Sequence, residues 1–342
     1  MRVVTFGETM LRLKSPGSER LFQSPFLEAT FGGSESNVAV SLSLLGEDAA
    51  FVTVFPDNAL ADSAIAQLRG YGVDTGGIVR VPGRMGLYFV EAGACQRSGS
   101  VIYDRAASAL AEAPPDAIDW PQVLKRADLL HLTGITPSVS ANAADATLTA
   151  ARCAKEMGVQ VSLDFNLRTN LWKYGKLPID VMPRLLESAD ICIANEEQAA
   201  AALGLELDGG AQTEGAPDPD RFRRLAEKIV SRFPNVRLCA TTLRESVSAD
   251  RNNLSAALWT RDEFLTARRY EIADIVDRIG AGDAFDAGLL YGLSRFDTHA
   301  EALEFAAAAA VLKHSVPGDI NLCTAGEIRR LAFGSGDGRI KR

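Results

Sequence analysis

The sequence has little of what nucleic-acid-binding, disulfide-stabilised or membrane-spanning proteins need. Lysine and arginine number 36 against 44 aspartate and glutamate, a net charge of −8, which argues against nucleic acid as the main partner. The five cysteines are widely spaced and include no C-x-x-C pair, so the sequence favours neither a disulfide framework nor a zinc site. The apolar run EFAAAAAVLKHS is too short to cross a membrane, and MRVVTFGETM predicts a first strand rather than a signal peptide. We therefore expect a cytoplasmic protein, whose charge still allows small anions as ligands.

Strand and helix patterns alternate along the 342 residues. Short runs rich in β-branched and apolar residues predict strands, and longer periodic segments between them predict helices. This alternation predicts an α/β fold with a mostly parallel central sheet covered by helices on both faces. The strand segments are RVVTFGE, AAFVTVF, DLLHLTG, VQVSLDF, DICIA and VRLCATT, and the helical segments are 35–45, 60–71, 141–157 and 220–233.

Residues 86–108 interrupt the alternation. The segment GLYFVEAGACQRSGSVIYDRAAS predicts two strands joined by a turn, with no helix between them. Because side chains alternate along a strand, Tyr103 and Arg105 should share one face. One interpretation is a flap over a ligand site. The other is an edge hairpin with a solvated arginine, and periodicity alone does not decide between them.

Polar residues gather where the predicted strands end. Ligands of open α/β sheets bind beyond the carboxyl ends of the strands, so these residues are site candidates. A pair of glycines before the first helix adds a place where a ligand can approach the backbone, although such a pair is usually only a turn. The candidates are Asp164, Asn166 and Arg168; Asn195, Glu196 and Glu197; Thr241, Thr242 and Arg244; Gly280 to Asp283; and Gly32, Gly33 and Asn37.

The segment GAGDAFD at 280–286 places a turn of small residues and a carboxylate at the start of an apolar helix. Such a turn lets backbone N–H groups converge, and the helix N-terminus adds partial positive charge, so the segment predicts an anion site. The Asp283 carboxylate would repel that anion, so its position suggests that it has a role of its own beside the anion. The alternative is that Asp283 is only a helix N-cap.

Two segments resemble the signature motifs of the PfkB, or ribokinase-like, carbohydrate kinases. They are GGSESNVAVSLSLLG near the N-terminus and DRIGAGDAFDAGLLYGL near the C-terminus. Within that family, YDRAAS and DFNLRTNLW are most similar to 2-keto-3-deoxygluconate kinases. The resemblance implies a ribokinase-like fold and phosphorylation of 2-keto-3-deoxygluconate to 2-keto-3-deoxy-6-phosphogluconate. Kinases for another sugar, such as fructose or ribose, and a catalytically silent sugar- or nucleotide-binding regulator are the alternatives.

The resemblance also implies roles for the turn. Asp283 would be the general base, and the backbone N–H groups of Gly280, Ala281 and Gly282 would form an anion hole. Since a helix N-terminus favours the charged carboxylate, we expect Asp283 to be ionised and weakly basic. A weak base suffices where the hydroxyl proton leaves late in a loose transition state.

A sugar acid brings a carboxylate, which matches the planar fork of arginine. Arg168 at a strand end and Arg105 on the flap are the candidates for holding it. The resemblance implies that the rest of the sugar contacts the predicted sugar-binding residues Gly32, Gly33, Asn37, Tyr88 and Tyr103.

The resemblance implies ATP and Mg²⁺, and here the sequence departs from the family pattern. The family often has N-x-x-E where this chain reads NEEQ, so we assign the metal contact to Glu197, with Glu196 as the alternative. Arg278 stands where threonine is common, and TTLRESVSADRNN replaces a glycine-rich stretch. The predicted nucleotide contacts are Asn166, Asn195, Thr242, Arg244, Ser246, Gly280 and Gly282.

For the whole chain we expect a single kinase domain, 1–342, with a β lid formed by about 10–30 and 84–108. An exposed lid could pair with a second copy of the chain, so a homo-oligomer is possible.

Overall fold

The computed structural model describes residues 1–206 and 217–334. Its larger sheet has the strand order β14-β13-β12-β11-β10-β9-β1-β4, and β15 pairs with β13. Neighbours from β4 to β12 are parallel, whereas β12, β13, β14 and β15 pair antiparallel. The mostly parallel sheet expected from the sequence is confirmed. The strands are β1 (Arg2–Phe6), β4 (Asp48–Val52), β9 (Leu129–Thr133), β10 (Gln160–Asp164), β11 (Ile191–Ile193), β12 (Leu238–Ser246), β13 (Asn252–Thr260), β14 (Phe264–Thr266) and β15 (Tyr270–Ile272).

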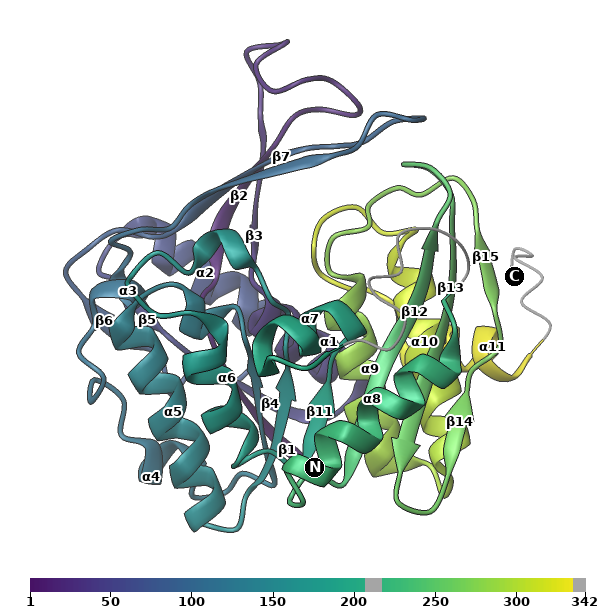
Figure 1. The fold of residues 1–342 in the computed structure, drawn as a ribbon. Coiled ribbons are helices and arrows are strands. Elements are labelled where there is room, and N and C mark those ends of the chain that lie inside the picture. Colours follow the sequence, from purple (N-terminus) through teal and green to yellow (C-terminus); the bar gives the residue numbers. More distant parts are fainter. Residues whose placement is uncertain (207–216, 335–342) are drawn as a thin grey trace.

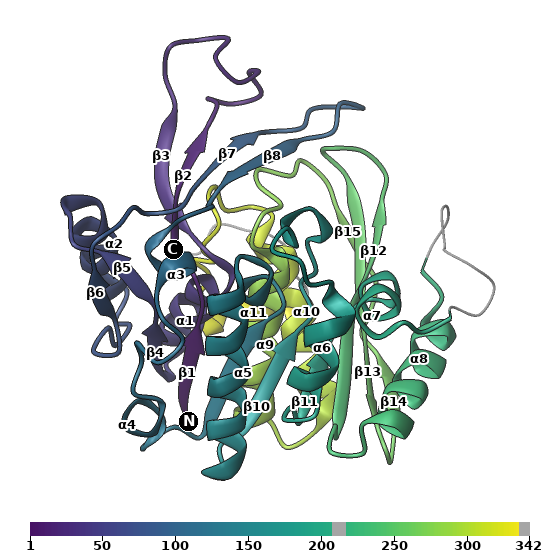
Figure 2. The same ribbon diagram turned by 60° about the vertical axis from the view of Figure 1, so that its left-hand side comes forward.

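Helices cover both faces of this sheet (Figures 1 and 2), and each face has its own apolar core. One core packs α5, α6 and α8 against the sheet, and the other packs α1, α9, α10 and α11. The four helices expected from periodicity are α1, α2, α5 and α8, each within a residue of its predicted ends. The helices are α1 (Ser34–Leu45), α2 (Ala59–Gly70), α3 (Ala109–Glu112), α4 (Trp120–Leu124), α5 (Ala141–Glu156), α6 (Pro178–Leu186), α7 (Glu196–Leu203), α8 (Pro219–Arg232), α9 (Ala281–Arg295), α10 (His299–Lys313) and α11 (Ala325–Phe333).

A second sheet, which we call the lid sheet, has the order β3-β2-β7-β8. Its strands are β2 (Met10–Lys14), β3 (Glu28–Gly32), β7 (Leu87–Glu91) and β8 (Ser100–Asp104). β7 and β8 pair antiparallel, as the hairpin pattern predicted. In Figures 1 and 2 this sheet stands over the carboxyl ends of the parallel strands. A minor sheet pairs β5 (Val54–Pro56) with β6 (Val79–Val81).

Side-chain caps fix where several helices begin. Ser140 accepts a hydrogen bond from the Ala143 N–H at the start of α5, and Asn195 does the same for Gln198 at the start of α7. Across 1–206 and 217–334, none of the helices combines the length and apolar character that a membrane span requires.

Candidate functional site

A cleft of about 1160 Å³ is lined by residues of the lid sheet and by residues at the carboxyl ends of the main strands. Every predicted site residue except Arg105 lines it. The sequence therefore identified residues from distant segments that the fold brings to one cavity. They are Gly32, Gly33, Asn37, Tyr88, Tyr103, Asn166, Arg168, Asn195, Glu197, Thr242, Arg244, Ser246, Gly280, Ala281, Gly282 and Asp283.

Asp283 lies in the first turn of α9, with only 8% of its surface exposed. The Ser34 hydroxyl donates to its Oδ1 at 2.6 Å, and the Asn37 Nδ2 donates to its Oδ2 at 2.7 Å. Both donors belong to the first turn of α1, so the N-terminal and C-terminal motifs meet at this carboxylate. The two hydrogen bonds fix its orientation toward the cleft, as a general base requires.

The pKa of Asp283 is raised, chiefly because burial penalises the charged carboxylate. The hydrogen bonds from Asn37 and Ser34 act in the opposite direction and lower it. The sequence analysis expected an ionised, weakly basic Asp283 because of the helix N-terminus, whereas burial shifts its pKa upward. A higher pKa makes Asp283 a stronger base than an exposed aspartate.

The turn before α9 takes a conformation that requires glycine. Gly280 has φ 83°, and a Cβ there would lie 1.9 Å from the carbonyl oxygen of Asp319. A Cβ at Gly282 would meet no atom within 4 Å, so open space adjoins the helix N-terminus. Of the three N–H groups predicted to form the anion hole, that of Ala281 makes a long bond of 3.4 Å to Arg278. The other two have no hydrogen-bond partner within the described residues, which suits them to an anion.

Two further carboxylates, Asp164 and Asp286, line the cleft near Asp283. Burial raises the pKa of both, and the negative charge of Asp283 raises both further. Asp164 also raises the pKa of Asp286, whereas the hydrogen bond with Asp286 lowers that of Asp164. The sequence analysis named Asp164 as a strand-end candidate, whereas it gave Asp286 no role. Asp286 lies one helical turn after Asp283, so the spacing of the motif could have indicated it.

The loop after β10 carries the predicted sugar-acid arginine. Arg168 is half-buried, lines the cleft, and donates from Nη1 to the Leu167 carbonyl at 3.1 Å. Before it, Asn166 has φ 32°, and its N–H donates to Asp164 Oδ1 at 3.1 Å. Asn166 Nδ2 also donates to Ser34 Oγ at 2.9 Å, which ties this loop to the Asp283 network.

Arg105 differs from the prediction of a flap arginine that faces the ligand. It follows β8, is 4% exposed, and makes two contacts with Glu8 Oε2 at 2.7 and 2.8 Å. Its guanidinium lies 5.9 Å from the centre of the Tyr103 ring, as a shared face predicts. The carboxylate of Glu8 thus takes the place that the sequence analysis assigned to the substrate, while Nη1 has no partner within the described chain.

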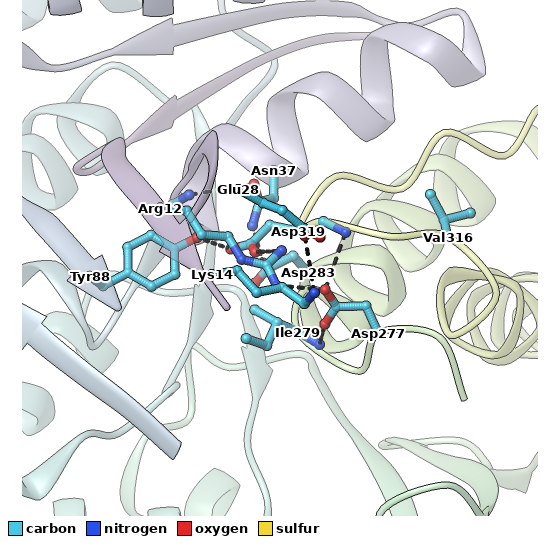
Figure 3. A network of polar contacts seen from close by, with 12 residues as sticks. Arg12, Lys14, Glu28, Asn37, Tyr88, Asp277, Ile279, Asp283, Val316 and Asp319 are labelled. Atoms are coloured by element: carbon cyan, nitrogen blue, oxygen red, sulfur yellow. Dashed lines mark hydrogen bonds and ion pairs between the residues drawn. The ribbon is translucent and has the colours of Figure 1, made fainter. Parts of the chain in front are cut away.

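The lid contributes two tyrosines that are cross-strand neighbours, Tyr88 and Tyr103. The Tyr88 hydroxyl donates to Asp319 Oδ2 at 2.6 Å, and Asp319 in turn pairs with Arg12 at 2.8 Å. Figure 3 shows these groups beside Asp283 and Asn37. Neither Arg12 nor Asp319 belongs to a recognisable motif, so sequence reasoning missed both.

On the other side of the cleft, β12 presents Thr242, Arg244 and Ser246. Nearby Arg278 donates from Nη2 to the carbonyls of Ser248 and Ala249 at 3.0 and 2.7 Å. Burial lowers the pKa of Arg244, and the positive charges of Arg278 and Arg168 lower it further. The Arg244 guanidinium makes no hydrogen bond or ion pair in the described part of the chain. Cations gathered without carboxylate partners suit a polyphosphate.

The NEEQ segment forms the start of α7. Asn195 and Gln198 cap each other reciprocally, with the Gln198 N–H donating to Asn195 Oδ1 at 2.8 Å. Glu196 pairs with Arg221 at 3.0 Å, whereas Glu197 is exposed and lines the cleft. Within 1–206 and 217–334, no three His, Cys, Asp or Glu side chains converge as a metal site.

Comparison with known proteins agrees with this geometry. The model of the pfkB family of carbohydrate kinases matches residues 1–325. The chain is 34% identical to the 2-dehydro-3-deoxygalactonokinase of Haloferax volcanii, with 99% of each protein covered. It is 42% identical to the solved 2-dehydro-3-deoxygluconokinase of Thermotoga maritima, with a TM-score of 0.90, 98% of this chain and all of that one covered. A pfkB family carbohydrate kinase from Listeria grayi is 34% identical, with a TM-score of 0.87 over 97% and 99% of the two chains. The chain has the ribokinase-like fold expected from its motifs and belongs to the pfkB family of carbohydrate kinases.

Proposed function

We propose that this kinase transfers the γ-phosphoryl group of ATP to 2-keto-3-deoxygluconate, giving 2-keto-3-deoxy-6-phosphogluconate. The observation that carries the proposal is a half-buried arginine, Arg168, in the same cleft as the held carboxylate Asp283. A planar guanidinium suits the carboxylate of a sugar acid, which neutral sugars lack. The Thermotoga and Haloferax relatives are named as kinases of two sugar acids that differ in one stereocentre, and these names support this substrate class.

In the proposed reaction, Asp283 accepts the proton of the attacking hydroxyl as the new oxygen–phosphorus bond forms. The bond between the γ-phosphorus and the β–γ bridging oxygen of ATP breaks, and ADP leaves. Ser34 and Asn37 hold the carboxylate in place before the proton is transferred. The N–H groups of Gly280, Ala281 and Gly282 stabilise the negative charge of the phosphoryl oxygens. Arg168 binds the carboxylate at the other end of the sugar. From the lid, Tyr88 and Tyr103 exclude water and contact the sugar, together with Gly32 and Gly33.

The residues of the cleft also fit the nucleotide and its metal ion. Arg244 and Arg278 would attract the phosphates, and Thr242, Ser246, Asn166 and Asn195 supply further polar groups. Mg²⁺ would neutralise charge on the phosphates, and Mg²⁺ usually keeps several waters and needs only one or two carboxylates. Because Glu196 is paired with Arg221, Glu197 is the acidic residue we assign to that role.

Arg105 enters the proposal in a different way from Arg168. Its pairing with Glu8 keeps it off the cleft surface, so direct contact with the sugar acid would need that ion pair to open. We therefore assign the carboxylate first to Arg168 and retain Arg105 as a second contact. We further propose a cytoplasmic enzyme whose chain forms a single kinase domain.

The test is a panel of acceptors with ATP and Mg²⁺, read by release of ADP. The panel holds 2-keto-3-deoxygluconate, its galactonate epimer, fructose and ribose. We expect the two sugar acids to have the highest kcat/KM, with the gluconate epimer first. Preference for fructose or ribose would overturn the substrate while leaving the kinase family intact. Nucleotide binding with no turnover on any acceptor would indicate a silent regulator.

A further inference from the structure

The inner face of the lid sheet carries an arginine that no motif explains. The register places Arg12 of β2 beside Tyr88 of β7, and Tyr88 beside Tyr103 of β8. These three side chains therefore form a row across the lid. Tyr88 and Tyr103 line the cleft, whereas Arg12 is 1% exposed and is among the largest fully buried side chains of the described residues.

Arg12 bridges two carboxylates that belong to different segments. Its Nη2 lies 2.6 Å from Asp277 Oδ2, and its Nη1 lies 2.8 Å from Asp319 Oδ1 (Figure 3). The Nζ of buried Lys313 donates at 3.0 Å to the Val316 carbonyl and lies 3.4 Å from the Asp277 carbonyl. Two cations and two carboxylates thus balance within one buried cluster, which limits the cost of burying charge.

Each carboxylate holds a part of the active site. Asp277 begins the turn that leads to the anion hole, and its Oδ1 accepts from the Ile279 N–H at 3.1 Å. Asp319 accepts from the Tyr88 hydroxyl at 2.6 Å, and its backbone carbonyl packs against Gly280 so closely that a Cβ would approach to 1.9 Å. Moving either carboxylate would therefore move the anion hole or the sugar-facing tyrosine.

We propose that Arg12 is a positioning residue for phosphoryl transfer, which sets the anion hole through Asp277 and Tyr88 through Asp319. The proposal rests on the kinase activity of the family and not on which sugar is the substrate. Phosphoryl transfer depends mainly on positioning, and a displacement of about 1 Å can cost roughly 100-fold in rate. The rigid fork of arginine can hold two carboxylates at fixed spacing, which a lysine ammonium on a flexible stem cannot.

The first test compares Arg12→Lys with the unsubstituted enzyme, using the acceptor that the panel identifies as best. The variant keeps the charge and loses the fork. We expect kcat to fall about 10- to 100-fold while the KM for ATP changes little, since anion-hole contacts act mainly in the transition state. Unchanged kcat with a folded protein would overturn the proposal.

The second test separates positioning from a purely structural role by a pair of matched tyrosine variants. Tyr88 and Tyr103 are neighbours that both line the cleft, but only Tyr88 bonds to Asp319. Tyr88→Phe should cost less kcat/KM for the sugar on the Arg12→Lys background than on the unsubstituted one. Tyr103→Phe should cost the same on both, within the roughly twofold scatter of independent sites. Equal costs of Tyr88→Phe on both backgrounds would overturn the link through Asp319.

If Arg12→Lys does not fold, Asp319→Asn takes its place. The amide oxygen still accepts from Tyr88, but the ion pair with Arg12 is lost. The proposal then predicts reduced kcat and the same selective coupling to Tyr88→Phe. Additive effects of Asp319→Asn with both tyrosine variants would contradict it.

Discussion

At the scale of single residues, burial and hydrogen bonding act against each other at Asp283. Burial raises the pKa of the carboxyl, and donation from Ser34 and Asn37 lowers it. The balance leaves a fixed carboxylate whose affinity for a proton exceeds that of an exposed aspartate. A helix N-cap needs neither these two partners nor the space beside Gly282. This arrangement favours the general base over the N-cap interpretation.

Replacing Asp283 tests that role. Asp283→Asn is nearly isosteric but cannot accept a proton, so turnover should fall by roughly 10²- to 10⁴-fold. ATP binding, measured by titration calorimetry, should be largely kept because the backbone N–H groups remain. Near-normal turnover in the variant would remove Asp283 from the mechanism.

Another buried carboxyl, Glu35, lies in the first turn of α1 and is 1% exposed. Its Oε1 accepts from the Thr133 and Thr136 hydroxyls, each at 2.6 Å. Burial raises its pKa to about 7. The folded state therefore binds this proton more tightly than the unfolded state does, and its stabilising effect is lost as pH rises from about 4.5 to about 7.

Glu35→Gln should remove this loss of stability at higher pH, because the glutamine side chain does not ionise. Its amide oxygen can still accept hydrogen bonds from both threonines. We expect the variant to match the unsubstituted protein near pH 5 and to be more stable near pH 8, by at most about 3 kcal/mol. Thermal unfolding at the two pH values measures the difference. Glu187→Gln, at an exposed residue, is the control and should show no such trend. Equal Tm differences at both pH values for Glu35→Gln would contradict the raised pKa.

At the scale of elements, the proposed active site lies where α1 and α9 begin. Two glycines of the same turn offer a matched comparison. Gly280→Ala places a Cβ 1.9 Å from the Asp319 carbonyl at φ 83°, so it should destabilise the protein by about 1–3 kcal/mol and reduce kcat. Gly282→Ala has open space and a helical position, so its Tm should stay or rise. Its methyl group would still obstruct the anion hole.

Thermal unfolding and kcat of the two variants give the measurement. Loss of activity without loss of stability in Gly282→Ala would support an anion at the helix N-terminus. Full activity of Gly282→Ala would indicate that no phosphoryl group approaches that turn.

Local patterns predicted the helices and strands well because their periodicity depends on residues that are close in the sequence. The four helices and the β7–β8 hairpin required no knowledge of distant contacts. Ion pairs are different, since Arg12 and Asp277 lie 265 residues apart and nothing in either segment indicates the other. For the same reason Arg105 was expected to face the ligand, although Glu8 pairs with it. The departures of NEEQ from the family pattern were visible, but the reciprocal cap that Gln198 makes needed the structure.

At the scale of the whole molecule, the lid sheet stands apart from the main sheet (Figure 1) and exposes apolar side chains. Phe22 and Phe26 are each 72% exposed, and Ile102 of β8 is 54% exposed. Phe22 and Phe26 lie between β2 and β3, so these large exposed apolar side chains all belong to the lid, which suits contact with a second copy. The lid-mediated homo-oligomer inferred from the sequence stays a prediction, and these residues define its test.

We expect the purified chain to form a dimer that Phe22→Ser together with Phe26→Ser weakens. Light scattering across a dilution series measures the shift toward monomer. Leu177→Ser, at a 62% exposed residue outside the lid, is the control and should leave the mass unchanged. A monomer at all concentrations, or a dimer equally stable in both variants, would contradict association through the lid.

The central claim is that one cleft joins a sugar acid, through Arg168, to the base Asp283. The most direct measurement is a double-mutant cycle in which one change removes the Arg168 guanidinium and the other removes the substrate carboxylate. Kinetics are compared for the unsubstituted enzyme, Arg168→Lys and Arg168→Ala, with 2-keto-3-deoxygluconate and a neutral analogue that lacks the carboxylate. We predict a roughly 10- to 150-fold loss of kcat/KM for the acid on Arg168→Ala, from a charge-assisted contact of about 1.5–3 kcal/mol. Arg168→Lys should also be poor with the acid, and Arg168→Ala should lose little with the analogue. Equal losses of Arg168→Ala with acid and analogue would contradict the account, because Arg168 would then serve ATP or the fold instead of the sugar acid.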